Sequence, residues 1–134
     1  MPGLHTTRII HGTDYRWLGS NHHRPARSGV LDLAAFAAHV KGGGVLYGQP
    51  SAGYVPSGTP VTKQGDRYVP YEVGASFDGV LLRDISVGDA GGDPMITAAI
   101  LDDGRLIGKY VPTADGEPFV TPDKTDNNTS IIFA

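Results

Sequence analysis

The sequence predicts a mostly β domain of the α+β class: a small compact barrel or sandwich with one short helix and an extended N-terminal arm. The length of 134 residues suits a single domain. The 19 Gly and 10 Pro favour many turns between short elements. From residue 45 onward, short apolar runs alternate with such turns. We therefore expect an arm over residues 1–27 and one β-rich domain over residues 28–134.

The expected arm differs from the rest of the chain in charge and in pattern. Residues 1–27 hold four arginines against one aspartate, a net charge of +3, whereas the remainder carries −6. The arm has no sustained period of 2 or 3.6, so it buries too little apolar surface to fold alone. It nevertheless contains Trp17, the single tryptophan of the chain. We expect it to become ordered on a partner; a flexible tail and packing on the body are the alternatives.

One segment, residues 32–41, has the periodicity of a helix. Asp32 is a good N-cap, and the three glycines at 42–44 end the pattern. Apolar side chains recur at helical spacing, at Leu33, Phe36, Ala37 and Val40. About ten residues of helix are marginally stable in isolation, so we expect this one to dock on a sheet.

The clearest pattern of strand and turn residues in the first half of the domain predicts a hairpin. Residues 59–63 and 67–71 flank Gln64-Gly65-Asp66, a three-residue connection with a central glycine. Pro60 and Pro70 cannot donate a backbone hydrogen bond, so these strands should be edges, or the prolines should lie near strand ends.

Further apolar runs predict strands at residues 45–47, 79–87, 95–101, 105–111 and 131–133. The run at 79–87 is the most apolar and should be a central strand. Asp103-Gly104 suits a type I′ turn, which predicts a second hairpin between the strands on either side of it.

The residue types that carry most enzyme chemistry are absent or have another explanation. The chain has no Cys, which excludes disulfides, thiolate metal sites and a cysteine nucleophile. No serine stands in a Gly-x-Ser-x-Gly elbow, and the adjacent His22 and His23 point to opposite sides of an extended chain. We predict no enzyme: no catalytic residue, no cofactor and no metal. The alternative is an enzyme that gathers His11, Asp14 and His22 round a cavity.

Charge and hydropathy also limit the partners. A net charge of −3 and a pI near 5.9 argue against a dedicated nucleic-acid binder. No apolar run approaches the ~18–20 residues that span a bilayer, and no secretory signal is visible in the first residues. We expect neither a nucleic-acid nor a membrane partner.

The order of turns and strands over residues 54–112 resembles a known family. The segments that carry the resemblance are Ser57-Gly58-Thr59-Pro60-Val61, Tyr68-Val69-Pro70-Tyr71, Gly79-Val80-Leu81-Leu82, Ala98-Ala99-Ile100-Leu101 and Tyr110-Val111-Pro112. In this order they resemble the head decoration (capsid cement) proteins of tailed bacteriophages, the group typified by the lambda decoration protein. The motifs are short and built on Gly and Pro, and they cover under half of the chain.

The resemblance implies a compact β-rich homotrimer that binds the major capsid protein at three-fold positions between capsomers. Such proteins clamp the shell after it expands and resist the pressure of the packaged genome, and their N-terminal arm becomes ordered by extending a capsid sheet. The implied location is the outer surface of the virion, after synthesis in the host cytoplasm. On this hypothesis the arm's capsid-binding residues are Arg8 and Arg16 for capsid acids, Ile9 and Ile10 in the added strand, and Tyr15, Trp17 and Leu18 as apolar anchors.

A second hypothesis is a small virion fibre or adhesion module that binds carbohydrate on a host surface. It predicts an exposed aromatic platform on the body, formed by Tyr47, Tyr54, Tyr68 and Tyr71. The simpler interpretation of these tyrosines is packing on strands.

Overall fold

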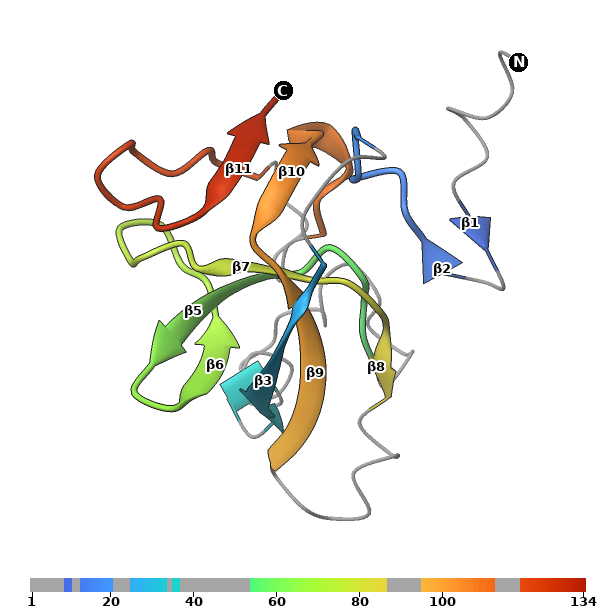
Figure 1. Cartoon of the computed structure of the whole chain (residues 1–134), viewed down its shortest axis with the longest axis vertical. Coiled ribbons are helices and arrows are strands. Elements are labelled where there is room, and N and C mark those ends of the chain that lie inside the picture. The colour runs from blue at the N-terminus through green and yellow to red at the C-terminus, as the bar shows by residue number, and fades with distance from the viewer. Residues whose placement is uncertain are drawn as a thin grey trace.

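The predicted fold class is confirmed: the chain is mostly β and contains a closed five-stranded barrel (Figure 1). A computed structural model describes residues 9–10, 13–20, 25–33, 35–36, 54–86, 95–112 and 119–134. Over these residues no helix has the length and apolar character needed to cross a membrane.

The barrel runs in the order β3-β6-β5-β7-β9 and closes because β9 pairs again with β3. Its strands are β3 (Arg27–Asp32), β5 (Pro60–Gln64), β6 (Arg67–Pro70), β7 (Gly79–Leu81) and β9 (Met95–Leu101). The β3–β6 pair, which meets at Leu31 and Tyr68, is parallel, and the other neighbouring strands are antiparallel.

Three small sheets lie outside the barrel. The antiparallel ones join β1 (Ile9–Ile10) to β2 (Thr13–Asp14) and β4 (Tyr54–Val55) to β8 (Ile85–Ser86). The parallel one joins β10 (Asp103–Leu106) to β11 (Ser130–Phe133), and a 3-10 turn, η3 (Gly108–Tyr110), follows β10.

The hairpin predicted around Gly65 is confirmed as β5–β6. Its turn is one residue shorter than expected, because Gln64 already pairs with Arg67. Gly65 takes a φ of +64°, the left-handed backbone that favours glycine. Pro60 begins β5 and Pro70 ends β6, so both prolines lie at strand ends, as predicted.

The second predicted hairpin is wrong. Asp103-Gly104 makes no turn, because both residues lie in β10, which leaves the barrel beyond the end of β9 and pairs with β11 (Figure 1). Asp102, between β9 and β10, is held at the place where the chain leaves the barrel. Its carboxylate lies 3.0 Å from the Arg27 guanidinium, and its carbonyl accepts a 2.9 Å hydrogen bond from the Ser130 N–H. Gly104, in β10, has a φ of +114°, a backbone conformation that favours glycine.

The predicted helix and central strand need smaller corrections. Asp32 pairs with Met95 as the last residue of β3 and directly precedes the helical turn, so its role as an N-cap stays a prediction. The helical turn begins at Leu33, and residues 37–41 lie outside the described residues, as do the expected strand at 45–47 and its neighbours. The run at 79–87 is divided into β7 and β8; β7 is fully buried between β5 and β9, which confirms the central position for that part.

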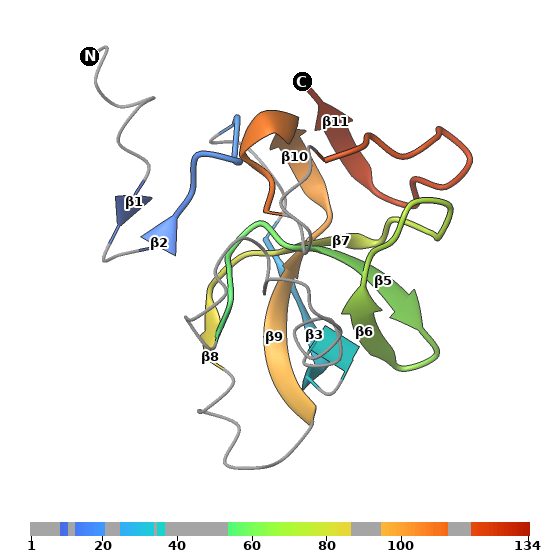
Figure 2. The ribbon, with the colours of Figure 1, turned by 180° about the vertical axis from the view of Figure 1, so that it is seen from behind.

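Two hydrophobic cores lie on either side of β7 and β9. The barrel core contains Leu31, Leu33, Phe36, Val55, Val61, Tyr68, Leu81, Ala98 and Ile100. The second core contains Trp17, Phe77, Val80, Leu101, Leu106, Val111 and Ile131. Each of the two strands feeds both cores, because successive side chains point to opposite faces. We call the region around the second core, built from residues 15–20, 103–112 and 119–134, the terminal lobe; it lies above the barrel in both views (Figure 2).

Candidate functional site

The expected anchor of the arm, Trp17, is buried in the protein's own second core, with 1% of its surface exposed. Its indole N–H donates a 3.0 Å hydrogen bond to Ser57 Oγ. Ser57 is itself held in place, because its hydroxyl donates to the Leu82 carbonyl at 2.9 Å and its N–H donates to Asp84 Oδ1 at 2.7 Å. The prediction that Trp17 anchors the arm on a partner is therefore wrong: the large apolar surface and the polar N–H are both satisfied within the chain.

Gly58 makes room for the indole. A Cβ on this residue would lie 2.5 Å from the Trp17 ring, and its φ of +88° is a backbone conformation that other residues rarely adopt. We call Ser57 and Gly58 together the indole slot.

Residues 17–20 run along the edge of β10 that β11 leaves open. The Ile107 N–H donates to the Trp17 carbonyl at 2.7 Å, the Gly19 N–H donates to the Arg105 carbonyl at 2.8 Å, and Leu18 bridges Leu106 in antiparallel register. This is strand addition to a sheet edge, as the arm was expected to perform, but the edge belongs to the same molecule. The predicted boundary at residue 27 is therefore wrong, because residues 15–20 form part of the folded body.

Tyr15 and Leu18, the other expected apolar anchors, are half-buried against the same core. The Tyr15 ring lies 6.3 Å from the Trp17 ring between centroids, and the Leu18 N–H donates to the Tyr15 carbonyl at 3.0 Å. Leu18 contributes to the protein's own packing, which corrects its assignment as a partner anchor. Tyr15 retains part of its surface for other contacts.

The first part of the expected arm contains the strand pair β1–β2. Ile9 pairs with Asp14 and Ile10 with Thr13. The pair stands apart from the barrel in both views (Figures 1 and 2). Arg8 and the side chains of Ile9 and Ile10 lie outside the described residues. We call β1 and β2 the leader pair.

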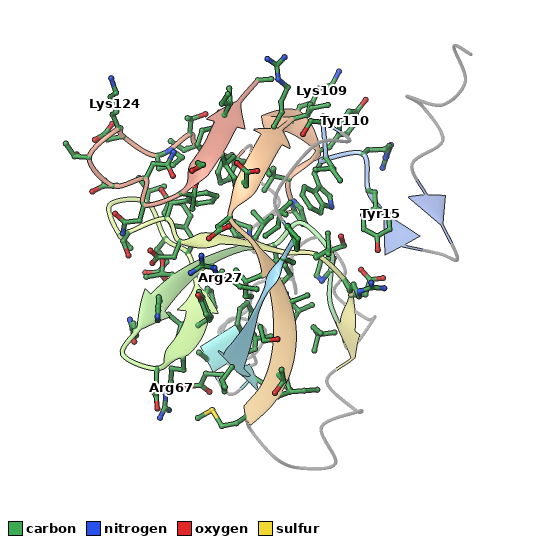
Figure 3. The ribbon with its side chains drawn as sticks, in the orientation of Figure 1. Tyr15, Arg27, Arg67, Lys109, Tyr110 and Lys124 are labelled. Atoms are coloured by element: carbon green, nitrogen blue, oxygen red, sulfur yellow. The ribbon has the colours of Figure 1, made fainter. Side chains whose placement is uncertain are left out.

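Arg16 lies beside two residues that the sequence interpretation missed. Its guanidinium carbon is 5.0 Å from the centre of the Tyr110 ring, and Lys109 Nζ is also 5.0 Å from that centre (Figure 3). Nothing local in the sequence links position 16 to positions 109 and 110, because the pairing of residues 17–20 with β10 brings them together.

The aromatic platform expected for a carbohydrate binder is wrong for two of its four residues. Tyr68 is buried in the barrel core, and Tyr71 is half-buried, with its ring 5.6 Å from Phe77 and 6.2 Å from Phe119. Burial raises the pKa of both phenols. Packing on a strand is confirmed for Tyr68, which lies in β6, whereas Tyr71 follows the end of that strand. Tyr47 and the side chain of Tyr54 lie outside the described residues.

Chemistry-bearing side chains do not cluster in the part of the chain that is described: no group of three or more His, Asp and Glu that would hold a metal occurs there. His11, His22 and the side chain of Asp14, which the enzyme alternative needs, lie outside it. Asp78 is a structural residue, since its carboxylate accepts bonds from the Lys63 N–H at 2.7 Å and from Asn128 Nδ2 at 3.0 Å.

Comparison of the chain with protein-family models, with curated proteins and with solved structures finds no match.

Proposed function

We propose that this protein is a head decoration protein of a tailed phage. It binds the major capsid protein on the outer surface of the expanded shell, as a homotrimer at three-fold positions between capsomers, and it stabilises the shell against the pressure of the packaged genome. The proposal is supported by the resemblance over residues 54–112 and agrees with the compact β-rich fold.

The observation that carries the proposal is the way the leader pair is fastened. It stands apart from the barrel, while the residues that follow it are buried in the second core and bonded to β10 (Figure 1). This arrangement suits a protein that grips a partner with its N-terminus and must not release it under load.

A force on the leader pair has two routes into the body. One runs through the backbone bonds between residues 17–20 and β10. The other runs through the Trp17 indole to Ser57, in the connection between β4 and β5, and so reaches the barrel. Because the two routes enter the body at different elements, β10 and the β4–β5 connection, the load is shared between them.

Trimerisation strengthens binding to the shell, because three leader pairs bind at once. Three leaders on one trimer bind with an effective concentration set by their short tethers, so modest individual contacts add up to near-permanent attachment. Strand pairing of Ile9 and Ile10 with a capsid sheet and an ion pair from Arg8 are the contacts that we assign to each leader.

The test is to mix the purified protein with expanded, undecorated tailed-phage capsids and image them by electron cryomicroscopy. We expect density at the three-fold positions. A variant that lacks residues 2–14 and keeps Trp17 should fold normally and leave those positions empty. Normal decoration by this variant would contradict the role of the leader pair.

A further inference from the structure

Residues 15–20, which we call the Trp17 segment, are fastened to the body by contacts with elements far along the chain. The Trp17 indole fills the indole slot and donates its N–H to Ser57 Oγ at 3.0 Å. The backbone of the segment adds a strand contact with β10, where the Gly19 N–H donates to the Arg105 carbonyl at 2.8 Å. The segment is therefore bound through one large side chain and through its backbone, at two separate places on the body.

The Trp17 segment is also matched to its binding surface in shape. Within the segment, the Leu18 N–H donates to the Tyr15 carbonyl at 3.0 Å, and the Tyr15 ring lies 6.3 Å from the Trp17 ring. Gly19 allows the Arg105 stem to pass, because a Cβ on Gly19 would lie 3.0 Å from Arg105 Cγ. This complementarity belongs to the segment and to the surface, so it is the same whichever copy of the chain supplies the segment.

A short connection joins the Trp17 segment to the barrel. It consists of residues 21–26, and it begins from a fixed point, because Arg27 pairs with Ile100 in the β3–β9 ladder. Six residues reach about 20 Å when fully extended. A folded chain of this length has a radius of gyration of about 14 Å. The connection is therefore long enough for the segment to reach a copy of the protein that is packed alongside.

Exchange of the Trp17 segment between copies would replace every contact of the segment by an identical one. The free energies of the two arrangements then differ only through the connection and the closeness of the next binding surface. In a separate molecule the segment binds its own body, because a short tether gives an effective concentration of the order of millimolar. Inside a homotrimer the neighbouring surface is held at a comparable concentration, and exchange adds the Trp17 contacts to those that keep the copies together.

We propose that the indole slot and the edge of β10 bind the Trp17 segment of a second copy of this chain, so that the three copies of the homotrimer exchange these segments in a closed ring. The inference rests on the proposed function for the homotrimer. It has a mechanical consequence: a force on the leader pair of one copy enters the body of the next copy. The load is then distributed over the trimer, and one subunit cannot leave without breaking Trp17 contacts.

The first experiment reads the arrangement with a disulfide. The chain has no Cys, so the double variant Gly19→Cys/Arg105→Cys has a single pair of thiols. The pair is within reach of a disulfide when the segment is bound, because a Cβ at position 19 lies 3.0 Å from Arg105 Cγ. We expect oxidation to link the chains in threes on denaturing, non-reducing gels. Arg105→Cys/Lys124→Cys is the control for random collisions, since Lys124 is exposed in the loop before β11, and its chains should stay single (Figure 3). Intrachain disulfides alone, seen as single chains without free thiols, would overturn the proposal.

The second experiment uses Trp17 as the only source of tryptophan fluorescence. The donor, Gly58→Leu, keeps Trp17 but obstructs its own indole slot; the acceptor, Trp17→Ala, has an open slot and no tryptophan. We expect the donor's emission to shift to shorter wavelength, towards that of the wild type, as acceptor is added. Trp17→Ala/Gly58→Leu, whose slot is obstructed, is the matched control and should leave the emission unchanged. Equal emission with both acceptors would contradict exchange. Gly58→Ala is the milder donor if Gly58→Leu does not fold.

Binding to expanded shells separates this inference from the proposed function. If oxidation of the Gly19→Cys/Arg105→Cys variant gives only intrachain disulfides in a protein that decorates the shell, exchange is wrong and the decoration function stands. If the chains are linked in threes but the shells stay bare, the decoration function is wrong and exchange stands. Chains linked in pairs would support exchange and overturn the homotrimer.

Discussion

The barrel core and the second core draw on segments that lie at different distances along the chain. The barrel contains one pair across a short connection, β5–β6, where Gln64 pairs with Arg67, and one distant pair, β3–β9, where Arg27 pairs with Ile100. The second core instead joins Trp17 near the N-terminus, Phe77 in the middle and Ile131 near the C-terminus. Closing long loops costs conformational entropy in both regions. The barrel includes the local β5–β6 hairpin, whereas the pairings of the terminal lobe join residues 17–20, β10 and β11, which are all distant from one another in the sequence.

The two cores are nevertheless coupled, because β7 and β9 supply both. In β7, Val80 faces the second core and Leu81 the barrel core; in β9, Leu101 and Ile100 divide in the same way. Damage to the terminal lobe therefore removes packing from one face of two barrel strands, and the variants below measure how far that damage spreads.

The largest expected loss of stability comes from an N-terminal deletion that includes the Trp17 segment. Deleting residues 2–20 removes the indole from the second core and the backbone bonds to β10. We expect a loss of at least about 3–5 kcal/mol in the free energy of unfolding, as for other buried aromatic side chains. Urea unfolding followed by far-UV circular dichroism measures it.

The matched truncation, of residues 2–14, separates the arm's two roles. This deletion should change the free energy of unfolding by less than about 0.5 kcal/mol, because a two-stranded pair that stands apart from the barrel contributes little. Equal destabilisation by the two truncations would show that the body begins before residue 15, against the boundary drawn here.

Gly58→Ala should have the next largest effect, through the indole slot. A Cβ there would lie 2.5 Å from the Trp17 ring and would keep a φ of +88°. We expect a loss of about 2–4 kcal/mol from overpacking and backbone strain together. In a Trp17→Ala background the overpacking disappears, so the effect of Gly58→Ala should fall by about half, a coupling that a double-mutant cycle measures.

Gly29→Ala, in the barrel, is the control for the double-mutant cycle of Gly58 and Trp17. Its Cβ would lie 2.5 Å from the Tyr68 ring, in the other core. Its effect should add to that of Trp17→Ala without coupling, because the two sites share no partner. Strong coupling would mean that the two cores rearrange together.

Ser57→Ala tests the polar half of the slot and should have a smaller effect. It leaves the Trp17 indole N–H buried without its 3.0 Å acceptor, which costs about 1–3 kcal/mol. Ser57→Thr, which keeps a hydroxyl, is the control. If Ser57→Ala unfolds at the wild-type urea concentration, the indole bond adds nothing to the fastening of the arm.

These contrasts explain which features were predictable from the sequence. Pro60, Gly65 and Pro70 act through their own backbone, so they marked the β5–β6 hairpin correctly. Asp103-Gly104 has the composition of a turn, but its conformation is decided by β11, which pairs with β10 from nearly thirty residues away. No local rule includes that partner.

The arm was misjudged for the same reason. Trp17 looked too apolar for solvent, which was correct, but its acceptor Ser57 and the edge of β10 lie far along the chain. The sequence therefore indicated that the segment needs a binding surface, and only the fold identifies that surface as the protein's own. The contacts of Arg16 and Lys109 with the Tyr110 ring were missed because the pairing of residues 17–20 with β10 brings Arg16 to that ring.

The smallest expected effect compares one tyrosine from each core under alkaline conditions. Burial raises the pKa of Tyr68 and of Tyr71 above the ordinary value of 10.0. At Tyr68 the Arg27 charge partly opposes the rise, whereas at Tyr71 the carboxylates of Asp126 and Asp123 add to it. Above about pH 10 the unfolded chain loses these protons before the folded chain does, so it binds fewer protons and stability falls as pH rises. Below that pH neither phenol contributes any slope.

Tyr68→Phe and Tyr71→Phe should each make the alkaline loss of stability shallower without changing its sign. The measurement is the urea midpoint followed from about pH 8 to about pH 11. Because barrel and lobe are coupled through β7 and β9, we expect the whole protein to unfold in one cooperative transition. The urea midpoint of the double variant should then fall less steeply with pH than that of either single variant. Two separate unfolding transitions in the wild type, each responding to one of the tyrosines, would instead make the terminal lobe an independently unfolding unit. A force on the leader pair would then unfold the lobe without being transmitted to the barrel.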